Sequence, residues 1–465
     1  MEDTGAKITP GASMSVLVLM STLFLGVAVL VIGYIVSRLS RSSRSSDSTK
    51  NSTGSEKVKF EDSRDPTSGT IGAGTTGGGA SSNKRTKNKK RREAQQEFTH
   101  SWMVGALKGH TAPVLDMNFS SNGKFLASCA EDRTVLLWCT KELTVKKKRS
   151  LRVNIEFDHA TLVRWSPDGK AFIIHKAVAN AIEVYKISKK SDGTLASATK
   201  ALEFPKRHTE EVVGMDIAST GKYIITCSKA NDLVIWDLKG QILASIEFYL
   251  GFIYRARVSP CGRFVGASGF TPDVNIFEVL FTKTGDFQVN KAFDLAGHSS
   301  GILDFDFSAD SSYMTTVSKD GTFRLYDTKI EFAKGEDPHL LLTGTWESAA
   351  TAKVALSPNT EVLAIAHGSS LSFYSTIDGL LDNTIEDIFM GPITCLAFDA
   401  LGEYVLVAGD KHIKVFHNIT GYRVAIESAK RKLAQKQTSA TKERLEKLIV
   451  DNMKFLDEMG EPFSQ

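Results

Sequence analysis

Cysteine is scarce in this sequence, with five among 465 residues. They are Cys129, Cys139, Cys227, Cys261 and Cys395, an odd number, widely spaced and without a CxxC pair. Disulfide frameworks and cysteine-based zinc sites depend on paired, closely spaced cysteines. The sequence therefore argues against both and suits a protein of a reducing compartment.

Signatures of catalysis are missing as well. The chain has no GxGxxG motif after a predicted strand, no Walker loop, no HExxH, no GxSxG and no set of kinase motifs. Its ten histidines are scattered, and a net charge of +4 does not by itself indicate a partner such as nucleic acid. We expect no catalytic residue, no cofactor and no metal site.

Long apolar runs are absent except near the N-terminus. Residues 14–36 (MSVLVLMSTLFLGVAVLVIGYIV) contain no charged side chain. As a helix they would extend about 35 Å, enough to cross a hydrocarbon core about 30 Å thick. A cleaved signal peptide fits poorly, because the run is too long and Glu2 and Asp3 precede it against a single Lys7. We expect a transmembrane anchor helix.

Positive charge flanks this run on one side. Arg38, Arg41 and Arg44 follow it, which favours a cytosolic location for everything after Val36 and a short luminal tail at residues 1–13. Three glycosylation sequons would then face the cytosol and stay unmodified; they begin at Asn51, Asn118 and Asn418.

Residues 37–97 show no apolar periodicity and are rich in Ser, Gly and Thr, which predicts a disordered tether. The tether ends in a basic run made of Lys84, Arg85, Lys87, Lys89, Lys90, Arg91 and Arg92. The run is either a solvated spacer or a contact for RNA phosphates or anionic lipid. No aromatic residue lies among these charges, so sequence-specific RNA readout by stacking is not supported.

From about residue 98 a unit of alternating strands and turns repeats seven times. Its first turns are SSNGKF (120–125), SPDGKAF (166–172), ASTGKY (218–223), SPCGRF (259–264), SADSSY (308–313), SPNTEV (357–362) and DALGEY (399–404). An interval of roughly 46 residues is typical of propeller blades. The pattern predicts an all-β, seven-bladed propeller over residues 98–420, which we expect to be monomeric.

The blade ends resemble the WD40-repeat family. The matching pairs are Gly109-His110, Gly297-His298, Trp236-Asp237 and the worn Tyr326-Asp327 and Trp138-Cys139, while His208 opens a third blade without a glycine. In that family a histidine, a turn aspartate, a strand Ser or Thr and the blade-end aromatic form a buried structural relay. The resemblance implies these relay residues: His110, Ser128, Asp132 and Trp138; His298, Thr316, Asp320 and Tyr326; and, with Ala230 in place of the aspartate, Thr226 and Trp236.

Propellers of this family close by pairing an N-terminal strand with the last blade, which removes a sheet edge. We expect residues 101–107 (SWMVGAL) to be that strand. Residues 421–465 follow as a helical tail whose apolar stripe is Leu445, Leu448, Ile449, Phe455, Leu456 and Met459. The stripe predicts a helix packed on the side of the propeller; a short coiled coil or a partner-binding helix is the alternative.

Longer segments resemble an ER-membrane branch of the WD40-repeat family, above all DHATLVRWSPDGKAFI (158–173), SPCGRFVGASGFTPDVNIFEV (259–279) and KDGTFRLYDT (319–328). The resemblance implies a single-pass protein of the endoplasmic reticulum membrane with a cytosolic propeller. It also implies a role as an adaptor, linked to the ER-stress kinase that phosphorylates a translation initiation factor and to RNA or ribosome-associated complexes.

Two other functions compete with a scaffold. A guanine-nucleotide exchange propeller of the ER membrane is one, although such a protein carries its anchor after the propeller and this chain carries it before. An RNA tether is the other. It would use the basic run, aided by Lys146, Lys147, Lys148 and Arg149 in the outer strand of the first blade.

Overall fold

The computed structural model describes residues 98–145, 148–282 and 287–463. The chain divides into two units, residues 1–87 and 88–465, and every described residue belongs to the second. The luminal tail (1–13), the anchor (14–36) and the tether with its basic run (37–97) therefore lie outside the described residues and stay predictions.

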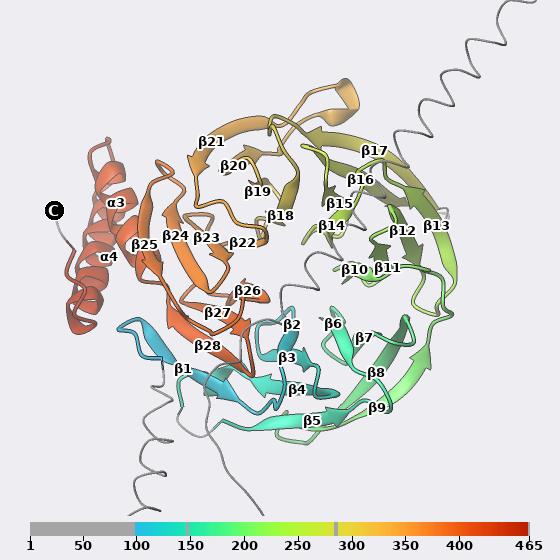
Figure 1. Ribbon diagram of the computed structural model, residues 1–465. Coiled ribbons are helices and arrows are strands. Elements are labelled where there is room, and N and C mark those ends of the chain that lie inside the picture. The colour runs from blue at the N-terminus through green and yellow to red at the C-terminus, as the bar shows by residue number, and fades with distance from the viewer. Residues whose placement is uncertain (1–97, 146–147, 283–286, 464–465) are drawn as a thin grey trace, which may run out of the picture. The chain divides into compact units, whose positions relative to one another are not determined.

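Seven four-stranded antiparallel sheets follow one another around a central channel (Figure 1). The predicted seven-bladed, all-β propeller is confirmed. The first strand of each blade is innermost. Blade 1 contains β2 Val114–Phe119, β3 Phe125–Ala130, β4 Thr134–Cys139 and β5 Ser150–Asn154, with a short 3-10 helix at Thr140–Glu142; blade 2 contains β6 Ala160–Trp165, β7 Ala171–Lys176, β8 Ala181–Lys189 and β9 Leu195–Glu203.

The other blades repeat this order. Blade 3 contains β10 Val212–Ile217, β11 Ile224–Ser228, β12 Asp232–Trp236 and β13 Ile242–Glu247; blade 4 contains β14 Ile253–Val258, β15 Phe264–Gly269, β16 Val274–Phe281 and β17 Phe287–Leu295. Blade 5 contains β18 Ile302–Phe307, β19 Tyr313–Ser318, β20 Thr322–Asp327 and β21 His339–Thr345, with a 3-10 helix at Phe332–Lys334; blade 6 contains β22 Ala352–Leu356, β23 Val362–His367, β24 Ser370–Ser375 and β25 Leu381–Ile385. Blade 7 contains β26 Cys395–Phe398, β27 Tyr404–Gly409 and β28 His412–His417, and its fourth strand is β1 Met103–Lys108.

The seven turns that reveal the repeat join the first and second strands of the blades. At the fourth residue of every turn the backbone is left-handed, with φ between 59° and 74°. The amide of that residue donates to the carbonyl of the first turn residue. Glycine adopts this conformation without strain and occupies five of the positions, while Ser311 and Thr360 hold the other two.

Strand β1 closes the ring. It pairs antiparallel with β28, so the sheet order of blade 7 is β1-β28-β27-β26 and the predicted closure is confirmed. Trp102, just before β1, is fully buried, with its ring centroid 5.4 Å from that of Phe373 in blade 6. The N-terminal strand is therefore held by two blades.

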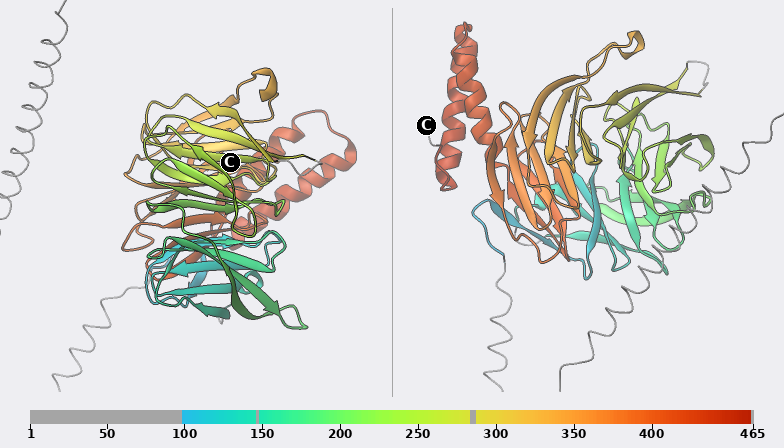
Figure 2. Two further views of the ribbon diagram at one scale, coloured as in Figure 1. Left: turned by 90° about the vertical axis from the view of Figure 1, so that its right-hand side faces the viewer. Right: turned by 45° about the horizontal axis from the view of Figure 1, so that its top comes forward.

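The tail forms two helices, α3 Ile419–Leu433 and α4 Ser439–Glu458, which stand beside blade 6 (Figures 1 and 2). Asn418 directly follows β28 and caps α3 by accepting from the Gly421 amide. Thr420 Oγ1 donates to Asp382 at 2.7 Å, and Arg423 bridges Asp382 and Glu461. The tail is thus tied to blade 6 by ion pairs as well as by apolar packing.

The apolar stripe of the tail packs inward at four of its six residues, and Leu445 and Leu448 are the exceptions. Leu456 is fully buried in the cluster that includes Trp102 and Phe373, and Ile449, Phe455 and Met459 pack against that cluster; Leu448 is 37% exposed. A helix packed on the side of the propeller is therefore confirmed. Among the described residues, neither helix combines the length and hydropathy needed to cross a bilayer.

Candidate functional site

The relay of blade 1 is assembled as the family resemblance implied. Nδ1 of His110 lies 3.2 Å from Asp132, Nε2 lies 2.8 Å from Ser128 Oγ, and Trp138 Nε1 donates to the same hydroxyl at 3.0 Å. The geometry is self-consistent for a neutral imidazole. Trp138 donates to Ser128, Ser128 donates to Nε2, and the Nδ1 proton goes to the carboxylate, so each buried polar group has a partner.

Blade 5 repeats the contacts of the histidine in this relay. His298 Nδ1 lies 3.0 Å from Asp320, and Nε2 lies 2.7 Å from Thr316 Oγ1. The aromatic end differs, because the Tyr326 hydroxyl donates to the carbonyl of Ala296 at 2.9 Å. Tyrosine therefore ties the end of the third strand to the loop that carries the histidine.

Blade 3 has a complete relay, and the prediction that it lacks the aspartate was wrong. His208 Nδ1 lies 2.6 Å from Asp232, Nε2 lies 2.7 Å from Thr226 Oγ1, and Trp236 Nε1 donates to that oxygen at 2.7 Å. Asp232 is the first residue of β12 and stands two positions after Ala230. In blades 1 and 5 a threonine at the corresponding position already borders the imidazole, so an aspartate there reaches it directly.

Burial lowers the pKa of the three relay histidines, His110, His208 and His298, and their aspartates offset this only in part. The rings are therefore neutral in the fold. Burial alone would raise the pKa of Asp132, but hydrogen bonds from Thr134 and the Thr111 amide outweigh it and hold that pKa low. Neutral histidine beside ionised aspartate makes the relay a structural hydrogen-bond chain.

Blade 2 uses a different device that the sequence did not indicate. The buried His175 bridges Thr161 Oγ1 at 2.6 Å and Asn180 Oδ1 at 2.9 Å. Buried Asp158 accepts from the amides of Val178 and Ala179. The turn between β7 and β8 is thus fixed without the relay pattern.

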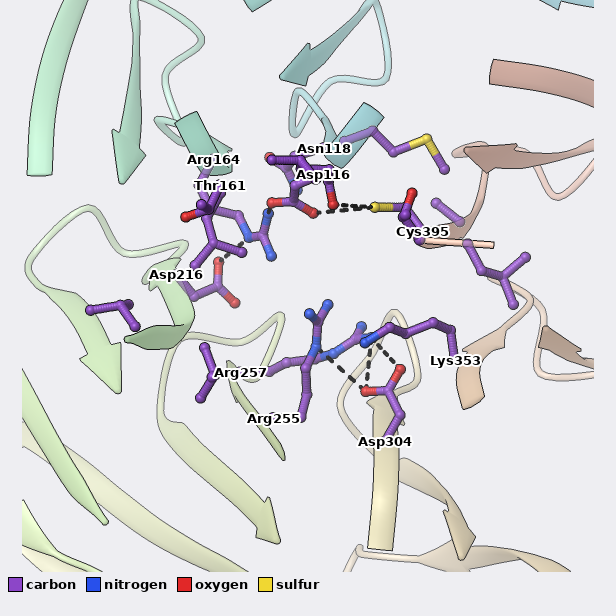
Figure 3. Close-up of a pocket in the computed structure, with 18 of the residues that line it drawn as sticks. Asp116, Asn118, Thr161, Arg164, Asp216, Arg255, Arg257, Asp304, Lys353 and Cys395 are labelled. Carbon is purple, nitrogen blue, oxygen red and sulfur yellow. Dashed lines mark hydrogen bonds and ion pairs between the residues drawn. The ribbon is translucent and has the colours of Figure 1, made fainter. Parts of the chain in front are cut away.

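The channel holds a second cluster that the sequence analysis missed. A cavity of about 470 Å³ lies between the inner strands, and Figure 3 shows charged side chains from six blades around it. Its charged lining includes Asp116, Arg164, Glu211, Asp216, Arg255, Arg257, Asp304 and Lys353. Positive and negative groups are equal in number, so the cavity is polar without a large net charge.

The aspartates of this cluster join neighbouring blades. Asp116 forms a buried ion pair with Arg164 of blade 2 and accepts from the Val163 amide at 3.0 Å. Asp216 of blade 3 joins blade 4 through a hydrogen bond, which it accepts from the Val258 amide at 3.0 Å. Removing one partner from such a pair leaves a buried charge unpaired, so these contacts hold the ring together.

On the other side of the channel the positive groups are less fully paired. Arg257 contacts Asp306 at 2.7 Å and shares Asp304 with Arg255 at 3.4 Å (Figure 3). In the described part of the chain no carboxylate lies within ion-pair distance of Lys353. Burial lowers the pKa of the Lys353 amine, although Asp304 counteracts part of the shift.

The thiols beside this cavity are poor nucleophiles. Burial raises the pKa of Cys395 to about 12 and that of Cys129 well above its usual value. A thiol with a raised pKa stays protonated and unreactive. Among the described residues no group of three His, Cys, Asp or Glu side chains is placed to hold a metal ion. The cavity can therefore bind polar groups, and its arrangement offers no obvious chemistry.

One face of the ring collects the exposed aromatic side chains. We call it the inter-blade face, because it carries the connections between blades and the turns between second and third strands. All four exposed aromatics of the described residues lie there, together with two aliphatic side chains; they are Phe157, Tyr249, Phe252, Phe270, Val178 and Met390. Their exposure runs from 64% at Phe252 to complete at Met390. Tyr249, Phe252 and Phe270 lie on neighbouring loops, and adjacent exposed apolar side chains are typical of an interaction surface.

The basic residues assigned to ligand contact have separate outcomes. The basic run, Lys84 to Arg92, lies outside the described residues. Lys148 precedes the outer strand, since β5 begins at Ser150, and its amine donates to the Ala106 carbonyl at 3.2 Å. The prediction that Lys148 lies in the outer strand was therefore wrong, and its contact with RNA stays a prediction.

The comparisons with known proteins agree with the fold. The model of the WD domain, G-beta repeat, matches residues 101–139, 200–237, 290–327 and 385–417, which contain the three inner strands of each relay blade and of blade 7. Human transducin beta-like protein 2 is 44% identical over 370 residues, covering 79% of this chain and 83% of that protein. The chain belongs to the transducin beta-like protein 2 family. This membership confirms the resemblance found in the sequence.

Other relatives of the family share the propeller more distantly. The mouse transducin beta-like protein 2 is 42% identical over 369 residues, 79% of this chain and 84% of its own. Human WD repeat, SAM and U-box domain-containing protein 1 is 27% identical over 48% of this chain and 47% of its own.

Proposed function

We propose that this protein is a non-enzymatic scaffold that binds other proteins through the inter-blade face. WD-repeat propellers generally mediate protein–protein interaction, and one observation carries the choice of face. The exposed aromatic side chains of the described propeller all lie on that face. The relay histidines and the thiols of Cys129 and Cys395 are buried, which supports a role in binding.

We also propose that the scaffold works at the cytosolic side of the endoplasmic reticulum membrane, anchored by residues 14–36. The uncharged run and the arginines that follow it support this topology. All five cysteines are free, which suits the cytosol. The partner proposed from the family resemblance is the ER-stress kinase, and the basic run is proposed to add contacts to RNA phosphates or anionic lipid.

Capture of the full-length chain from cells tests the scaffold directly. The tagged protein is extracted from alkaline-washed membranes, captured with and without ribonuclease digestion, and its partners are identified by mass spectrometry. We expect the chain to stay with the membrane pellet and the same protein partners to remain after ribonuclease. Loss of all partners on digestion would establish an RNA tether instead, and absence of any partner would refute the scaffold.

The basic run has its own test. Replacing its seven positive residues by glutamine should leave the melting temperature unchanged, because they precede the propeller. If the run contacts single-stranded RNA, the slope of log K against log salt should become shallower by about 0.7 per lost contact. If it contacts anionic lipid, vesicle binding should fall by roughly 1 kcal/mol per charge. Binding curves identical to those of the unaltered protein in both assays would remove the run from the function.

A further inference from the structure

Three of the exposed aromatic side chains belong to neighbouring loops of blade 4. Tyr249 and Phe252 lie on the connection from β13 to β14, and Phe270 lies on the turn between β15 and β16. Their exposed fractions are 89%, 64% and 64%. We call these three residues the blade-4 patch.

The backbone beneath the patch is firmly held. The Phe270 amide donates to the carbonyls of Leu250 at 3.0 Å and Phe252 at 2.9 Å, and Asn231 Nδ2 of blade 3 donates to the Gly251 carbonyl at 2.5 Å. A Cβ on Gly269 would lie 2.2 Å from the Phe252 carbonyl, so glycine is needed for the two loops to stack. The aromatic rings are thus presented on loops that are already ordered.

Ordered but exposed aromatic rings are poor contributors to stability and good anchors for a partner. They bury little area in the propeller, so the hydrophobic effect gains little from them there. Aromatic side chains dominate binding energy at protein interfaces, and a preformed backbone reduces the entropy lost on binding. The patch therefore has the properties of a binding surface.

A groove beside the patch indicates the charge of the partner. It measures about 200 Å³, and its lining includes Ile253, the residue after Phe252. Its lining is apolar apart from Tyr254, Thr351 and three lysines, and includes no acidic residue; the lysines are Lys229, Lys319 and Lys353. The groove and the channel cavity share Tyr254 and Lys353, and Arg255, the residue after Tyr254, also lines the cavity. The groove thus joins the channel cavity near Arg255 and Arg257, which share Asp304.

These lysines are only partly compensated. Lys319 donates to the Tyr254 hydroxyl at 2.9 Å and lies 4.6 Å from the centre of its ring. Lys229 pairs with Glu211, and both side chains are at least half exposed, a geometry in which the pair contributes little. Together with Lys353, they leave the groove complementary to carboxylates.

We propose that the blade-4 patch and this groove bind an acidic peptide segment of a partner protein. An aromatic or aliphatic side chain of the peptide packs on Tyr249, Phe252 and Phe270, and its carboxylates face Lys229 and Lys319. This proposal rests on the scaffold function and adds the site and the chemistry of the partner. The same face supplies a matched control, since Phe157 is 92% exposed but follows the exposed Glu156, which repels an acidic peptide.

Selection of random twelve-residue peptides displayed on phage, using the full-length chain as bait, tests the proposal. We expect enrichment of peptides that combine Asp or Glu with Phe, Trp or Leu. A synthetic peptide from that pool should lose at least about tenfold in affinity on F252S/F270S and weaken with added salt. The F157S control should bind like the unaltered protein, and all variants should keep its melting temperature.

Charge reversal sharpens the test. K229E/K319E should weaken the acidic peptide and bind a version of it in which Lys replaces each acidic residue. Basic or uncharged peptides as the main product, no enriched peptide, or affinity unaffected by F252S/F270S would overturn the proposal.

The result for the blade-4 site can be distinguished from the result for the scaffold function. If capture from cells still yields protein partners while the patch variants change none of them, the scaffold stands and the blade-4 site fails. A lipid surface is the remaining occupant to exclude. If F252S/F270S weakens binding of the full chain to phosphatidylserine vesicles while peptide binding is unchanged, the patch contacts membrane and the proposal is wrong.

Discussion

Blades 1 and 4 have the same four-stranded sheet but use their loops in opposite ways. In blade 1 the inter-blade connection carries His110, which is buried and bonded to Asp132 and Ser128. In blade 4 the corresponding connection carries Tyr249 and Phe252, which are exposed. In blade 1, which matches the WD repeat, the connection carries a polar side chain that is buried in the relay. In blade 4, which lacks the relay, the connection carries aromatic side chains that are exposed to a partner.

The comparison separates residues that stabilise the propeller from residues that bind. Relay blades 1, 3 and 5 coincide with segments that the WD-repeat model matches, and blade 4 falls between two of those segments. We therefore expect substitutions in relay blades to act on stability and substitutions on the blade-4 patch to act on partners.

The largest expected effect is the difference in stability between replacing an aromatic residue of blade 1 by alanine and replacing one of blade 4. Trp138 is 2% exposed and ends the blade 1 relay, so Trp138→Ala should destabilise the propeller by about 3–5 kcal/mol. Phe252→Ala, at a position that is 64% exposed, should change stability by no more than about 0.5 kcal/mol. Urea unfolding of the two variants measures both, and equal destabilisation would show that the patch is part of the core.

A smaller loss of stability tests whether Asp232 completes the relay of blade 3, which was predicted from the sequence to lack its aspartate. Asp232→Ala should destabilise by about 1–3 kcal/mol, as Asp132→Ala should in blade 1, because each leaves a buried histidine without its acceptor. Ala230→Ser, two residues earlier, serves as the neutral control. If Asp232→Ala leaves the unfolding free energy unchanged while Asp132→Ala lowers it, blade 3 has no working relay.

The relays also predict how stability depends on pH. Since burial lowers the pKa of His110, His208 and His298, the unfolded chain binds protons at a higher pH than the fold does. Stability should be fully present above the unfolded value of about 6.5 and fall as the pH drops below it. The loss should not exceed about 1.4 kcal/mol per pH unit for each histidine.

Thermal unfolding between pH 8 and about pH 5.5 checks this sign. Carboxyl groups whose pKa burial raises, such as Asp306, act in the opposite direction as the pH falls, so the same scan on Asp306→Asn separates their contribution from that of the histidines. A gain in stability on acidification would mean that the imidazoles are charged and form ion pairs with their aspartates.

The smallest expected effect is the absence of a glycan. The structure weakens the sequon test for two sites, because Asn418 is buried as the α3 cap and Asn118 accepts from the Trp165 amide in the channel wall. Asp192→Asn creates a sequon, Asn-Gly-Thr, at the exposed tip of the β8–β9 turn. We expect no glycosidase-sensitive mass shift from it in cells. The same substitution behind a secretory signal peptide, in place of residues 1–36, is the positive control, and a shift in the unaltered context would reverse the topology.

The turn repeat made the fold predictable from sequence, because a left-handed residue at a fixed turn position is a local requirement. Relay members were found in blades 1 and 5 for a similar reason, since their spacing is regular. Asp232 was missed because only one spacing between histidine and aspartate was considered. The carboxylate also reaches the ring from two residues further along the chain.

The channel cluster was missed because charges on inner strands meet only when seven sheets close into a ring. A signal was nevertheless present. Arg164, Asp216, Arg257 and Asp306 each stand five residues before the left-handed turn residue of their blade. No sequence pattern predicted that the aromatic residues of the blade-4 patch are exposed, because their exposure depends on how two loops stack in the fold.

Site-specific photo-cross-linking in cells tests the central claim most directly. A photoreactive phenylalanine analogue is placed at position 252 on the inter-blade face, or at position 401 on the opposite face, where Leu401 is 77% exposed. The account predicts covalent protein adducts from position 252 that position 401 does not give. Adducts from position 401 alone, or none from either position, would contradict it.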